Sequence, residues 1–439
     1  MINFKKLRQF LTKNERNKTY LRKNKKSARS VADSKLRTKT ILHKSGINVP
    51  KLIVRFRSEK DLTKFRWEDL EGNFVVKPAS GYGGEGIIIV RKRGKYAGDW
   101  VKMDGSIIST PDVIRHCQEI LIGKFSLHNT PDSVIVEERI KIHPMFLSIT
   151  KTGTPDIRVI VYNKVPVMAM FRIPTDKSGG KANLQQGAIG LGIDLATGIT
   201  TFGIEGKGNI IRKIYDFGKK KLRKVNGIKI PFWREILETS VKCQEAMPGL
   251  GFFGVDVVLD KEKGPMVLEV NARPGLSIQI CNRAGLKIRM NKVEEVEVRS
   301  INHAIILSKY LFGEKFFEKV EEKEKVKTVG PLEVIKVKIG KGKKNTKEMR
   351  AKIDTGAFRS SIDRTLATEL GLLAPEKILY SRHYRSALGK NMDRPVIGLT
   401  FWLKDRKIVT AVNVADRKKL RTKFLLGRKD LQGFLVKTN

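Results

Sequence analysis

The sequence predicts an α+β protein with a largely antiparallel sheet, followed by a small all-β domain. Three observations carry this prediction. Runs of β-branched residues alternate with amphipathic helical patterns over the first 312 residues, the charged stretch EEKEKVKTVGP begins at residue 321, and short strands separated by turns fill the rest. With 439 residues the chain exceeds what one hydrophobic core usually supports, so two or more domains are expected.

Cysteine use and hydropathy predict a soluble protein in a reducing compartment. Cys117, Cys243 and Cys281 stand far apart and in no CxxC pair, which excludes a disulfide framework and a cysteine-based zinc cluster. No run approaches the roughly 20 apolar residues of a membrane helix. The opening stretch MINFKKLRQFLTKNERNK lacks the apolar block of a signal peptide. We therefore expect a cytoplasmic protein without a transmembrane segment.

The charge of the chain is extreme, because 88 Lys and Arg against 45 Asp and Glu give a formal net charge of +43. Such a field favours polyanionic partners, namely nucleic acid, an anionic membrane or an acidic polypeptide. The lysines are spread along the chain, so a general lysine bias is an equally weighted alternative. No RNP segment or KH loop supports nucleic-acid recognition.

The first 30 residues form a basic segment with a single acidic residue, Glu15. Within it Phe4, Leu7, Phe10 and Leu11 recur at helical spacing. This pattern predicts a short basic amphipathic helix that docks on the body of the protein or stays mobile.

The main domain is expected over residues 31–312. It begins with a helix that ends near Gly46 and a strand led by Pro50. Strands are predicted at the β-branched runs 74–90 (interrupted by a glycine loop), 134–140, 156–174, 251–260 and 265–276. Apolar residues three and four apart predict helices over 111–123, 231–247 and 300–320. The last helix runs into a charged linker placed at 313–328, and the all-β domain is placed at 329–439.

A lysine followed by a glycine loop is the first feature with chemical meaning. Lys77 closes the buried strand VVKP, and SGYGGEG follows at once. A lysine at a strand end holds its ammonium group at a fixed point, and glycines let backbone N–H groups approach phosphate oxygens. The order differs from a Walker A sequence, in which the lysine follows the glycines. An ordinary hairpin turn is the competing interpretation of the loop alone.

A set of oxygen ligands is the second feature. Glu269 and Asn271 stand two apart in the strand LEVN and therefore share a face. Asp256 lies on the preceding strand, which is paired to LEVN through the turn KEKG. Two carboxylates and an amide oxygen suit Mg²⁺, which keeps water and nucleotide phosphates in its other positions. A polar pair at a strand edge is the alternative for Glu269 and Asn271 taken alone.

In order along the chain, seven segments resemble the ATP-grasp superfamily, and within it the alpha-L-glutamate ligase-like (RimK-like) branch: DSK, VVKPASGYGGEG, VIVEERI, DIRVIV, KANLQQG, GVDVV and LEVNARPGL. The resemblance covers roughly residues 31–310. It implies an ATP-grasp fold, in which two α+β lobes enclose the nucleotide.

The resemblance also implies roles for particular residues. Glu137 to Ile140 would form the linker whose backbone contacts adenine, and Glu138 is a candidate for ribose contact. Phosphates would be held by Lys35, Lys77 and the loop glycines Gly81, Gly83, Gly84 and Gly86. The other implied roles are triphosphate contact by Lys181 and Asn183, metal ligation by Asp256, Glu269 and Asn271, and neutralisation of a carboxylate or a transferring phosphoryl group by Arg158 and Arg273.

Such ligases activate a carboxylate as an acylphosphate with ATP and Mg²⁺, for which Mn²⁺ is an alternative, and an amine then attacks to give an amide. The enzyme contributes positioning and electrostatic stabilisation. This fits the dispersal of the six histidines and the lack of a Ser-His-Asp or Cys-His pattern in the domain. Many such ligases carry a nucleotide-fold domain ahead of the first lobe, whereas only the basic segment precedes Asp33. The acceptor is therefore left open, and a sugar-transfer-associated ATP-grasp branch with similarly short N-termini is an alternative.

The tail contains IDTGA, in which a strand delivers Asp354 into a tight turn, and KFLLGRKDLQGFLV, with an apolar pair before Gly427. The pair resembles a retropepsin lobe, and more narrowly a family described as ATP-dependent zinc proteases, over roughly residues 330–439. Nothing supports zinc, because there is no HExxH and His383 is the only histidine in the domain. An aspartic mechanism needs two carboxylates around one water, so activity would require a homodimer that joins two copies of Asp354. An inert β-barrel used for binding is the equally weighted alternative.

Three functional hypotheses result. The leading one is an ATP- and Mg²⁺-dependent carboxylate–amine ligase that adds glutamate or a similar amino acid to an amino-acid or peptide substrate, with acidic substrates favoured by the positive charge. In this hypothesis the tail domain processes or binds the product. The second is a nucleic-acid- or ribosome-associated protein that uses the ATP-grasp fold as a clamp, and the third is a hydrolase that depends on Asp354.

Overall fold

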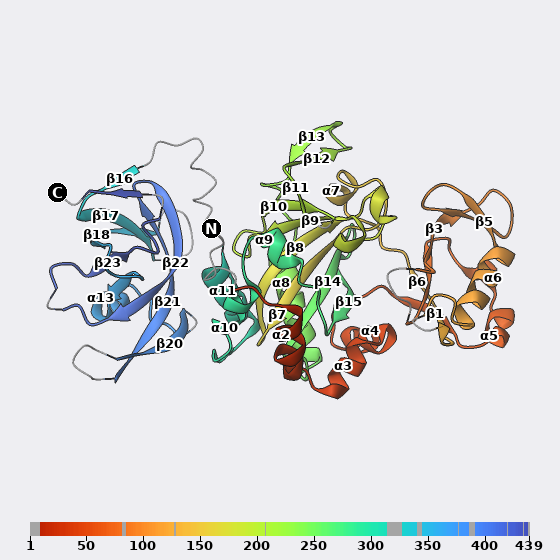
Figure 1. The fold of residues 1–439 in the computed structure, drawn as a ribbon, viewed down its shortest axis with the longest axis horizontal. Helices are drawn as coiled ribbons and strands as arrows, with labels where there is room; N and C mark the ends of the chain where they lie inside the picture. The colour runs from red at the N-terminus through yellow and green to blue at the C-terminus, as the bar shows by residue number, and fades with distance from the viewer. Residues whose placement is uncertain are drawn as a thin grey trace. The chain divides into compact units, whose positions relative to one another are not determined.

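The chain folds into two compact units (Figure 1). In the computed structural model the described residues are 9–80, 85–126, 129–206, 208–313, 327–339, 345–375, 377–385, 391–418, 420–432 and 434–437. Unit 1 comprises Met1–Ile193 and Gly198–Ile288, and unit 2 comprises Asp194–Thr197 and Arg289–Asn439.

A six-stranded antiparallel sheet forms the first lobe of unit 1, in the order β1-β6-β2-β3-β4-β5. Two helices pack against its strands, and the aromatic rings of Phe74 and Trp100 meet edge to face in the core between them. The elements are β1 (Leu52–Phe56), α5 (Glu59–Lys64), η2 (Trp67–Asp69), β2 (Phe74–Pro78), β3 (Ile88–Arg93), β4 (Asp99–Lys102), β5 (Ile107–Ser109), α6 (Thr110–Leu121) and β6 (Val134–Glu138).

A seven-stranded antiparallel sheet forms the second lobe, in the order β11-β10-β9-β8-β7-β14-β15. Helix α8 packs on β7, β8, β14 and β15, while α9 packs on β8, β9 and β10. Strands β8 and β14 are buried along their whole length, as their β-branched and aromatic sequences predict. The elements are α7 (Pro144–Leu147), β7 (Asp156–Tyr162), β8 (Val165–Ile173), η4 (Asp176–Ser178), η5 (Leu184–Gln186), β9 (Ile189–Ile193), β10 (Thr200–Glu205), β11 (Asn209–Ile211), the separate hairpin β12 (Lys213–Asp216) and β13 (Lys221–Lys224), α8 (Trp233–Ala246), β14 (Phe252–Asp260), β15 (Gly264–Asn271), α9 (Ile278–Asn282) and α10 (Leu286–Asn291).

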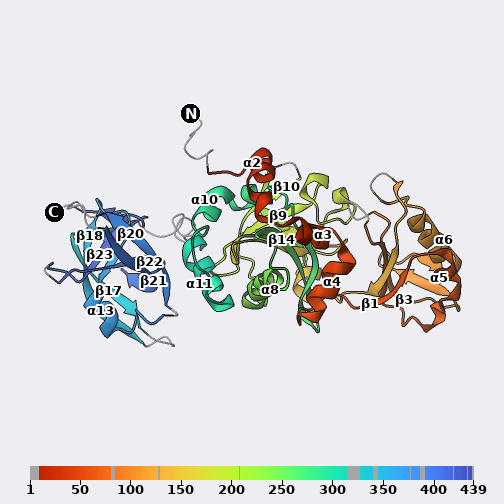
Figure 2. The same ribbon diagram turned by 90° about the horizontal axis from the view of Figure 1, so that it is seen from below.

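The basic N-terminal segment docks on this second lobe, which is one of the two outcomes left open by the sequence. The side chain of Asn24 bonds to four backbone groups, with its Nδ2 donating to the carbonyls of Phe252 (2.6 Å) and Ala272 (3.1 Å) and its Oδ1 accepting from two N–H groups. Figure 2 shows α2 and α8 on opposite sides of strands β9 and β14. The segment contains α2 (Lys13–Lys18), η1 (Tyr20–Lys23) and α3 (Lys26–Ala32), and it leads into α4 (Lys35–Lys44).

The helix predicted from Phe4, Leu7, Phe10 and Leu11 lies largely outside the described residues, so it stays a prediction. Phe10 and Leu11 precede α2. Leu11 is buried, and its backbone N–H and C=O both form hydrogen bonds with the side chain of Gln279. Phe4 and Leu7 lie outside the described residues. Leu11 therefore anchors the start of the described segment on the second lobe.

Unit 2 contains the predicted small β-barrel. Six strands follow one another in the order β17-β18-β23-β19-β22-β21, and pairing of β17 with β21 closes the ring. Strand β20 extends the sheet beyond β21, and α11 packs on β20 and β22. The elements are α11 (Ile301–Phe312), β16 (Lys327–Val329), β17 (Leu332–Lys338), β18 (Thr346–Asp354), β19 (Ser361–Asp363), α13 (Arg364–Glu369), β20 (Ile378–Arg385), β21 (Asn391–Leu403), β22 (Arg406–Ala415), β23 (Phe424–Gly427) and β24 (Phe434–Val436).

Two details of unit 2 differ from the prediction. The domain is not all-β, because it contains helix α13. Asp363 caps this helix by accepting a hydrogen bond from the Leu366 N–H. The helix predicted over 300–320 ends at Phe312 within the described residues. Residues 314–326, which hold most of the predicted linker, lie outside them.

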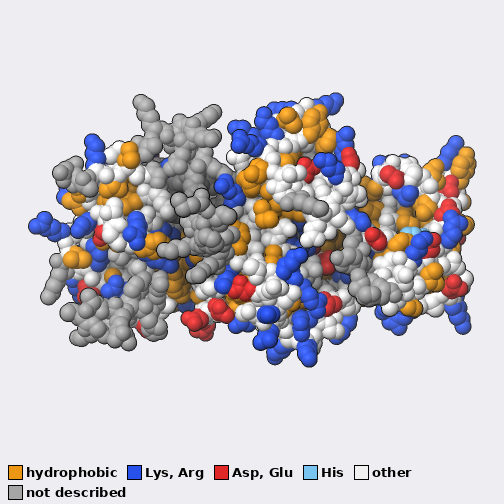
Figure 3. Space-filling model, viewed as in Figure 1, with side chains coloured by type: hydrophobic (Ala, Val, Ile, Leu, Met, Phe, Trp, Pro, Cys, Tyr) orange, Lys and Arg blue, Asp and Glu red, His pale blue; other side chains and the backbone are white. Residues whose placement is uncertain are grey.

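Charge on the described surface is dispersed. Figure 3 shows blue lysine and arginine side chains over most of the drawn face of unit 1, and they are dense where Figure 1 draws α2 and α3. Among the described helices, none has the combined length and apolar character needed to cross a membrane.

Candidate nucleotide-binding site

A carboxylate held between two buried lysines lies in the first lobe. Strand β6 pairs with β2, which brings Glu137 beside Val75 and within reach of Lys77. Lys77 forms an ion pair with one oxygen of Glu137, and Lys39 of α4 forms an ion pair with the other. Glu137, Lys39 and Lys77 are 3%, 6% and 9% exposed. The three groups therefore compensate one another where little water reaches.

The pKa values in this cluster show an excess of positive charge. Burial, followed by the charge of Lys77, lowers the pKa of Lys39 to about 7 despite the attraction of Glu137. Burial alone would raise the pKa of Glu137, but the two ammonium groups outweigh it and lower that pKa. Lys35, one helical turn before Lys39, also has a lowered pKa, chiefly from burial and then from the charge of Lys77, with Glu269 opposing. Glu137 is thus paired with two lysines while Lys35 lies nearby, and this concentration of positive charge suits a polyphosphate.

Lys39 was missed by the sequence reasoning. It follows Lys35 by four residues in KLRTK, so both side chains leave the same face of α4. That spacing is the signal from which it could have been found.

A second polar cluster lies on the large sheet, where the pairing register places Arg158, Asp256 and Glu269 side by side on β7, β14 and β15. Arg158 binds Asp256 through two bonds, with Nε to Oδ1 at 2.7 Å and Nη2 to Oδ2 at 2.6 Å. Arg172 reaches the same Oδ2 at 2.7 Å, and it also pairs with Asp156. Burial alone would raise the pKa of Asp256, but the two guanidinium groups outweigh it and lower that pKa to about 2.

Glu269 is the unsatisfied member of this cluster. Burial, then the charge of Asp256, raises its pKa. Among the described residues none donates a hydrogen bond to its carboxylate. Asn271 lies two residues further along β15, opposite Gly254. The set of two carboxylates and an amide oxygen fits Mg²⁺ in its donor chemistry, and a cation would relieve the repulsion between Glu269 and Asp256.

Two observations bear on whether these oxygen ligands can hold a metal ion. In the part of the chain that the structure describes, no group of three or more His, Cys, Asp or Glu side chains could hold a metal ion. Both oxygens of Asp256 are already bonded to arginines. Arg172 and Asp156 were not predicted, because FRIP and DIR contain no spacing that distinguishes these residues from ordinary strand positions.

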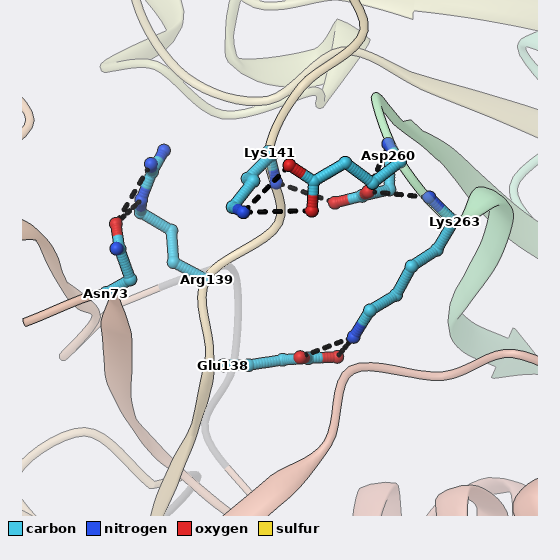
Figure 4. A network of polar contacts seen from close by, with 7 residues as sticks. Asn73, Glu138, Arg139, Lys141, Asp260 and Lys263 are labelled. Atoms are coloured by element: carbon cyan, nitrogen blue, oxygen red, sulfur yellow. Dashed lines mark hydrogen bonds and ion pairs between the residues drawn. The ribbon is translucent and has the colours of Figure 1, made fainter. Parts of the chain in front are cut away.

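The connection between the lobes contains a network of ion pairs (Figure 4). Glu138, at the end of β6, accepts hydrogen bonds from Lys263 at 2.6 and 2.8 Å and from the Lys51 N–H at 2.9 Å. The Lys141 N–H donates to Asp260 at 2.7 Å, which fixes the connecting strand on the β14–β15 turn. Ribose contact by Glu138 stays a prediction, and a ribose would have to compete with Lys263 for this carboxylate. Ile140 follows β6 in the same connection and is half-buried.

The glycine loop is described only at its end. Gly81, Gly83 and Gly84 lie outside the described residues. Gly86 has φ +70°, and a Cβ there would lie 2.6 Å from Cγ of Phe125. Only glycine fits that position without displacing the ring.

Of three other predicted residues, two have side-chain partners nearby. The Asn183 side chain accepts a hydrogen bond from the Gln185 N–H at 3.0 Å and so caps η5, and Lys181, nearby, is half-buried. Arg273 binds both oxygens of Asp33, at 2.9 and 3.0 Å. In the structure the guanidinium groups of Arg158 and Arg273 are bonded to the protein carboxylates of Asp256 and Asp33. Their neutralising role toward a substrate stays a prediction.

Asp354 ends strand β18, opposite Gly427 of β23. Its Oδ1 accepts hydrogen bonds from the N–H groups of Gly356 (2.9 Å) and Ala357 (3.1 Å). A Cβ on Gly427 would lie 2.5 Å from the backbone carbon of Arg359, so the IDTGA turn and the LLG strand approach closely. This geometry is that of a tight, self-bonded turn.

The two α+β lobes are the architecture expected of an ATP-grasp protein, and comparison with known families confirms the superfamily assignment. Residues 15–295 match the sequence model described as sugar-transfer associated ATP-grasp. Since this match covers well over half of the chain, the protein belongs to that family. The glutamate ligase-like branch stays a prediction. No curated protein matches the chain.

Solved structures similar to the chain include the ATP-grasp ligase PsnB in complex with a minimal precursor, at 14% identity and TM-score 0.32, covering 62% of each chain. A D-alanine–D-alanine ligase from Bacillus anthracis is similar at 16% identity and TM-score 0.33, covering 65% of this chain and 70% of that one. The protein Lpg0085 of unknown function (DUF785) from Legionella pneumophila has 19% identity and TM-score 0.17, and the match covers 26% of this chain and 94% of that one. We base no inference about activity on similarities of this size.

Proposed function

We propose that the protein is an ATP- and Mg²⁺-dependent carboxylate–amine ligase. The observation that carries the proposal is the cluster of Lys35, Lys39 and Lys77 around Glu137, with Lys35 also under the influence of Glu269 from the second lobe. A polyphosphate bound there would meet Lys77 of the first lobe, the two lysines of α4 and the carboxylate set of the second lobe. Membership of an ATP-grasp family supports the same assignment.

In this proposal Lys35 and Lys77 bind phosphate oxygens, and Asp256, Glu269 and Asn271 hold Mg²⁺. When bound, the cation neutralises charge on the phosphates. A substrate carboxylate oxygen attacks the γ-phosphorus, the bond to ADP breaks, and an acylphosphate forms. An amine then attacks the acyl carbon, phosphate leaves, and the amine proton passes to solvent. The chain's own contribution is positioning and charge stabilisation.

The acceptor is proposed in two forms. Glutamate or a similar amino acid added to an amino-acid or peptide acceptor follows from the motifs of the main domain. An acceptor that carries a sugar is favoured by the family to which the chain belongs.

The test is release of ADP and phosphate by the full chain with ATP, Mg²⁺ and pools of amino acids, peptides and amino sugars, with products identified by mass spectrometry. Lys77→Ala and Glu269→Ala should each abolish pool-dependent release. Lys60→Ala and Glu245→Ala, which change exposed residues of unit 1, are the matched controls. Equal release by Lys77→Ala and Lys60→Ala would refute the site.

For the barrel we propose a role in gripping or trimming the product. Hydrolysis would require a homodimer that joins two Asp354 side chains. Longer products from Asp354→Asn than from the unaltered chain would support trimming, and unchanged products from a monomeric protein would leave the barrel as a binding module.

A further inference from the structure

An open cavity of about 370 Å³ lies beside the proposed nucleotide site, and the N-terminal segment forms most of it. Its lining residues are Lys26, Arg29, Ser30, Asp33, Ser34, Ser80 and Arg273. Ser34 immediately precedes Lys35, and Ser80 precedes the glycine loop. The cavity therefore adjoins the end of the site where phosphates are proposed to lie.

The lining is built almost wholly of groups that bind anions. It contributes two guanidinium groups, one ammonium group and three hydroxyl groups, against the single carboxylate of Asp33, so its formal charge is +2. The Nε of Arg29 is buried and makes no hydrogen bond within the described structure. Nearby Arg16 has a lowered pKa, from burial and then from the charge of Arg273, so positive charge is crowded here. A buried guanidinium N–H without a partner in such a field favours an anionic ligand.

Asp33 forms a weak ion pair with one of these cations, Arg273. The ion pair between Arg273 and Asp33 is 48% exposed on both sides. Exposed pairs of this kind contribute little to stability. A substrate carboxylate or phosphate can therefore displace Asp33 from Arg273 at small cost.

We propose that this cavity binds the second substrate of the ligase through an anionic group, a carboxylate or a phosphate, with Arg29 and Arg273 as its ligands. The inference rests on the proposed ligase function, since it identifies the anion as the ligase's substrate. The volume suits a group the size of an amino acid or a single sugar.

The experiment is isothermal titration calorimetry of the full chain, at fixed ionic strength, with three probes used separately: L-glutamate, D-glucuronate and inorganic phosphate. The first two test carboxylates and the third tests phosphate. Arg29→Ala should weaken binding of the preferred probe by about tenfold or more, the scale of a lost charge-assisted hydrogen bond. Arg22→Ala removes the same charge from an exposed site on the same segment, and it should change binding by less than about twofold.

Asp33→Asn should change the affinity for the probe in the opposite direction. It removes the competitor for Arg273 and raises the charge of the lining to +3, so the preferred probe should bind about threefold more tightly. Because this variant gains binding, misfolding cannot produce the expected result.

The outcomes separate this inference from the proposed function. ATP binding is measured on the same proteins, and Arg29→Ala should retain it while Lys77→Ala should lose it. If none of the probes binds, or if Arg29→Ala and Arg22→Ala behave alike while ATP still binds, the anion site is refuted and the nucleotide site stands. If the unaltered chain binds the probes but not ATP, the ligase function fails and the cavity is no longer a ligase substrate site.

Discussion

Replacing Glu137 with glutamine tests the buried cluster most directly. Glutamine keeps the shape of the side chain but removes the only carboxylate bonded to Lys39 and Lys77 among the described residues. All three groups are less than a tenth exposed. Breaking a buried ion pair from one side costs about 3–5 kcal/mol, because the remaining charge is left uncompensated. We expect unit 1 to lose about 3 kcal/mol of its free energy of unfolding, the lower end of that range, since the glutamine oxygen still accepts a hydrogen bond.

The assay is urea denaturation followed by tryptophan fluorescence, with and without ATP. Trp67, Trp100 and Trp233 are buried in unit 1 and should report its unfolding. ATP phosphates would supply the missing negative charge, so saturating ATP should stabilise the variant more than the unaltered chain.

The control is Glu119→Gln, which breaks a surface ion pair with Lys124 in the same lobe. It should change stability little, because water and salt screen such a pair. Equal losses in Glu137→Gln and Glu119→Gln, or an ATP effect that is the same in all three proteins, would refute the reasoning.

Three further predictions concern other parts of the molecule. Because Lys39 has a pKa of about 7 when folded and an ordinary value of 10.5, the unfolded chain binds more protons in that window, so the free energy of unfolding should rise with pH there. The rise should reach about 1.4 kcal/mol per pH unit and be absent from Lys39→Gln in urea titrations between about pH 7 and 9, and an unchanged slope would contradict the assignment. Asn24→Ala should cost unit 1 about 2–3 kcal/mol in the same assay, since four backbone groups lose their partner in three buried bonds and one part-buried bond, and a cost below about 0.5 kcal/mol would show that the segment is not anchored there. Asp354→Ala should destabilise unit 2 by about 1–2 kcal/mol through two lost backbone hydrogen bonds, with ATP binding unchanged, and a loss of ATP binding would contradict the separation of the two roles.

Most of the fold could be predicted from the sequence, because its signals are local. Helix α4 ends before Gly46, whose φ of +71° suits glycine, and β14 pairs with β15 through the predicted turn. The placement of Asp256 beside Glu269 followed from strand alternation and that hairpin. The superfamily followed from the order of motifs, each of them weak alone.

What could not be predicted depends on contacts between distant segments. The anchoring of Asn24 on β14 joins residues 228 positions apart. The bonds from Arg158 and Arg172 that occupy Asp256 depend on the register of three strands. No pattern in NERNKTYLRKN or FRIP indicates these long-range contacts. The partners of Asn24 and the arginines bonded to Asp256 therefore could not be predicted from the sequence.

Helix α4 has a consequence for the order of events in the proposed reaction. Two of its lysines lie one turn apart: Lys39 forms an ion pair with Glu137, while burial and then the charge of Lys77 lower the pKa of Lys35. Positive charge is therefore concentrated at this end of the helix, although Glu269, Asp132 and Glu137 offset part of it. The binding of ATP first would neutralise this charge and leave the neighbouring cavity less positive for a small anion. The small anion should therefore bind more weakly after ATP than before it, and calorimetric titration of the anion with and without ATP would measure the difference.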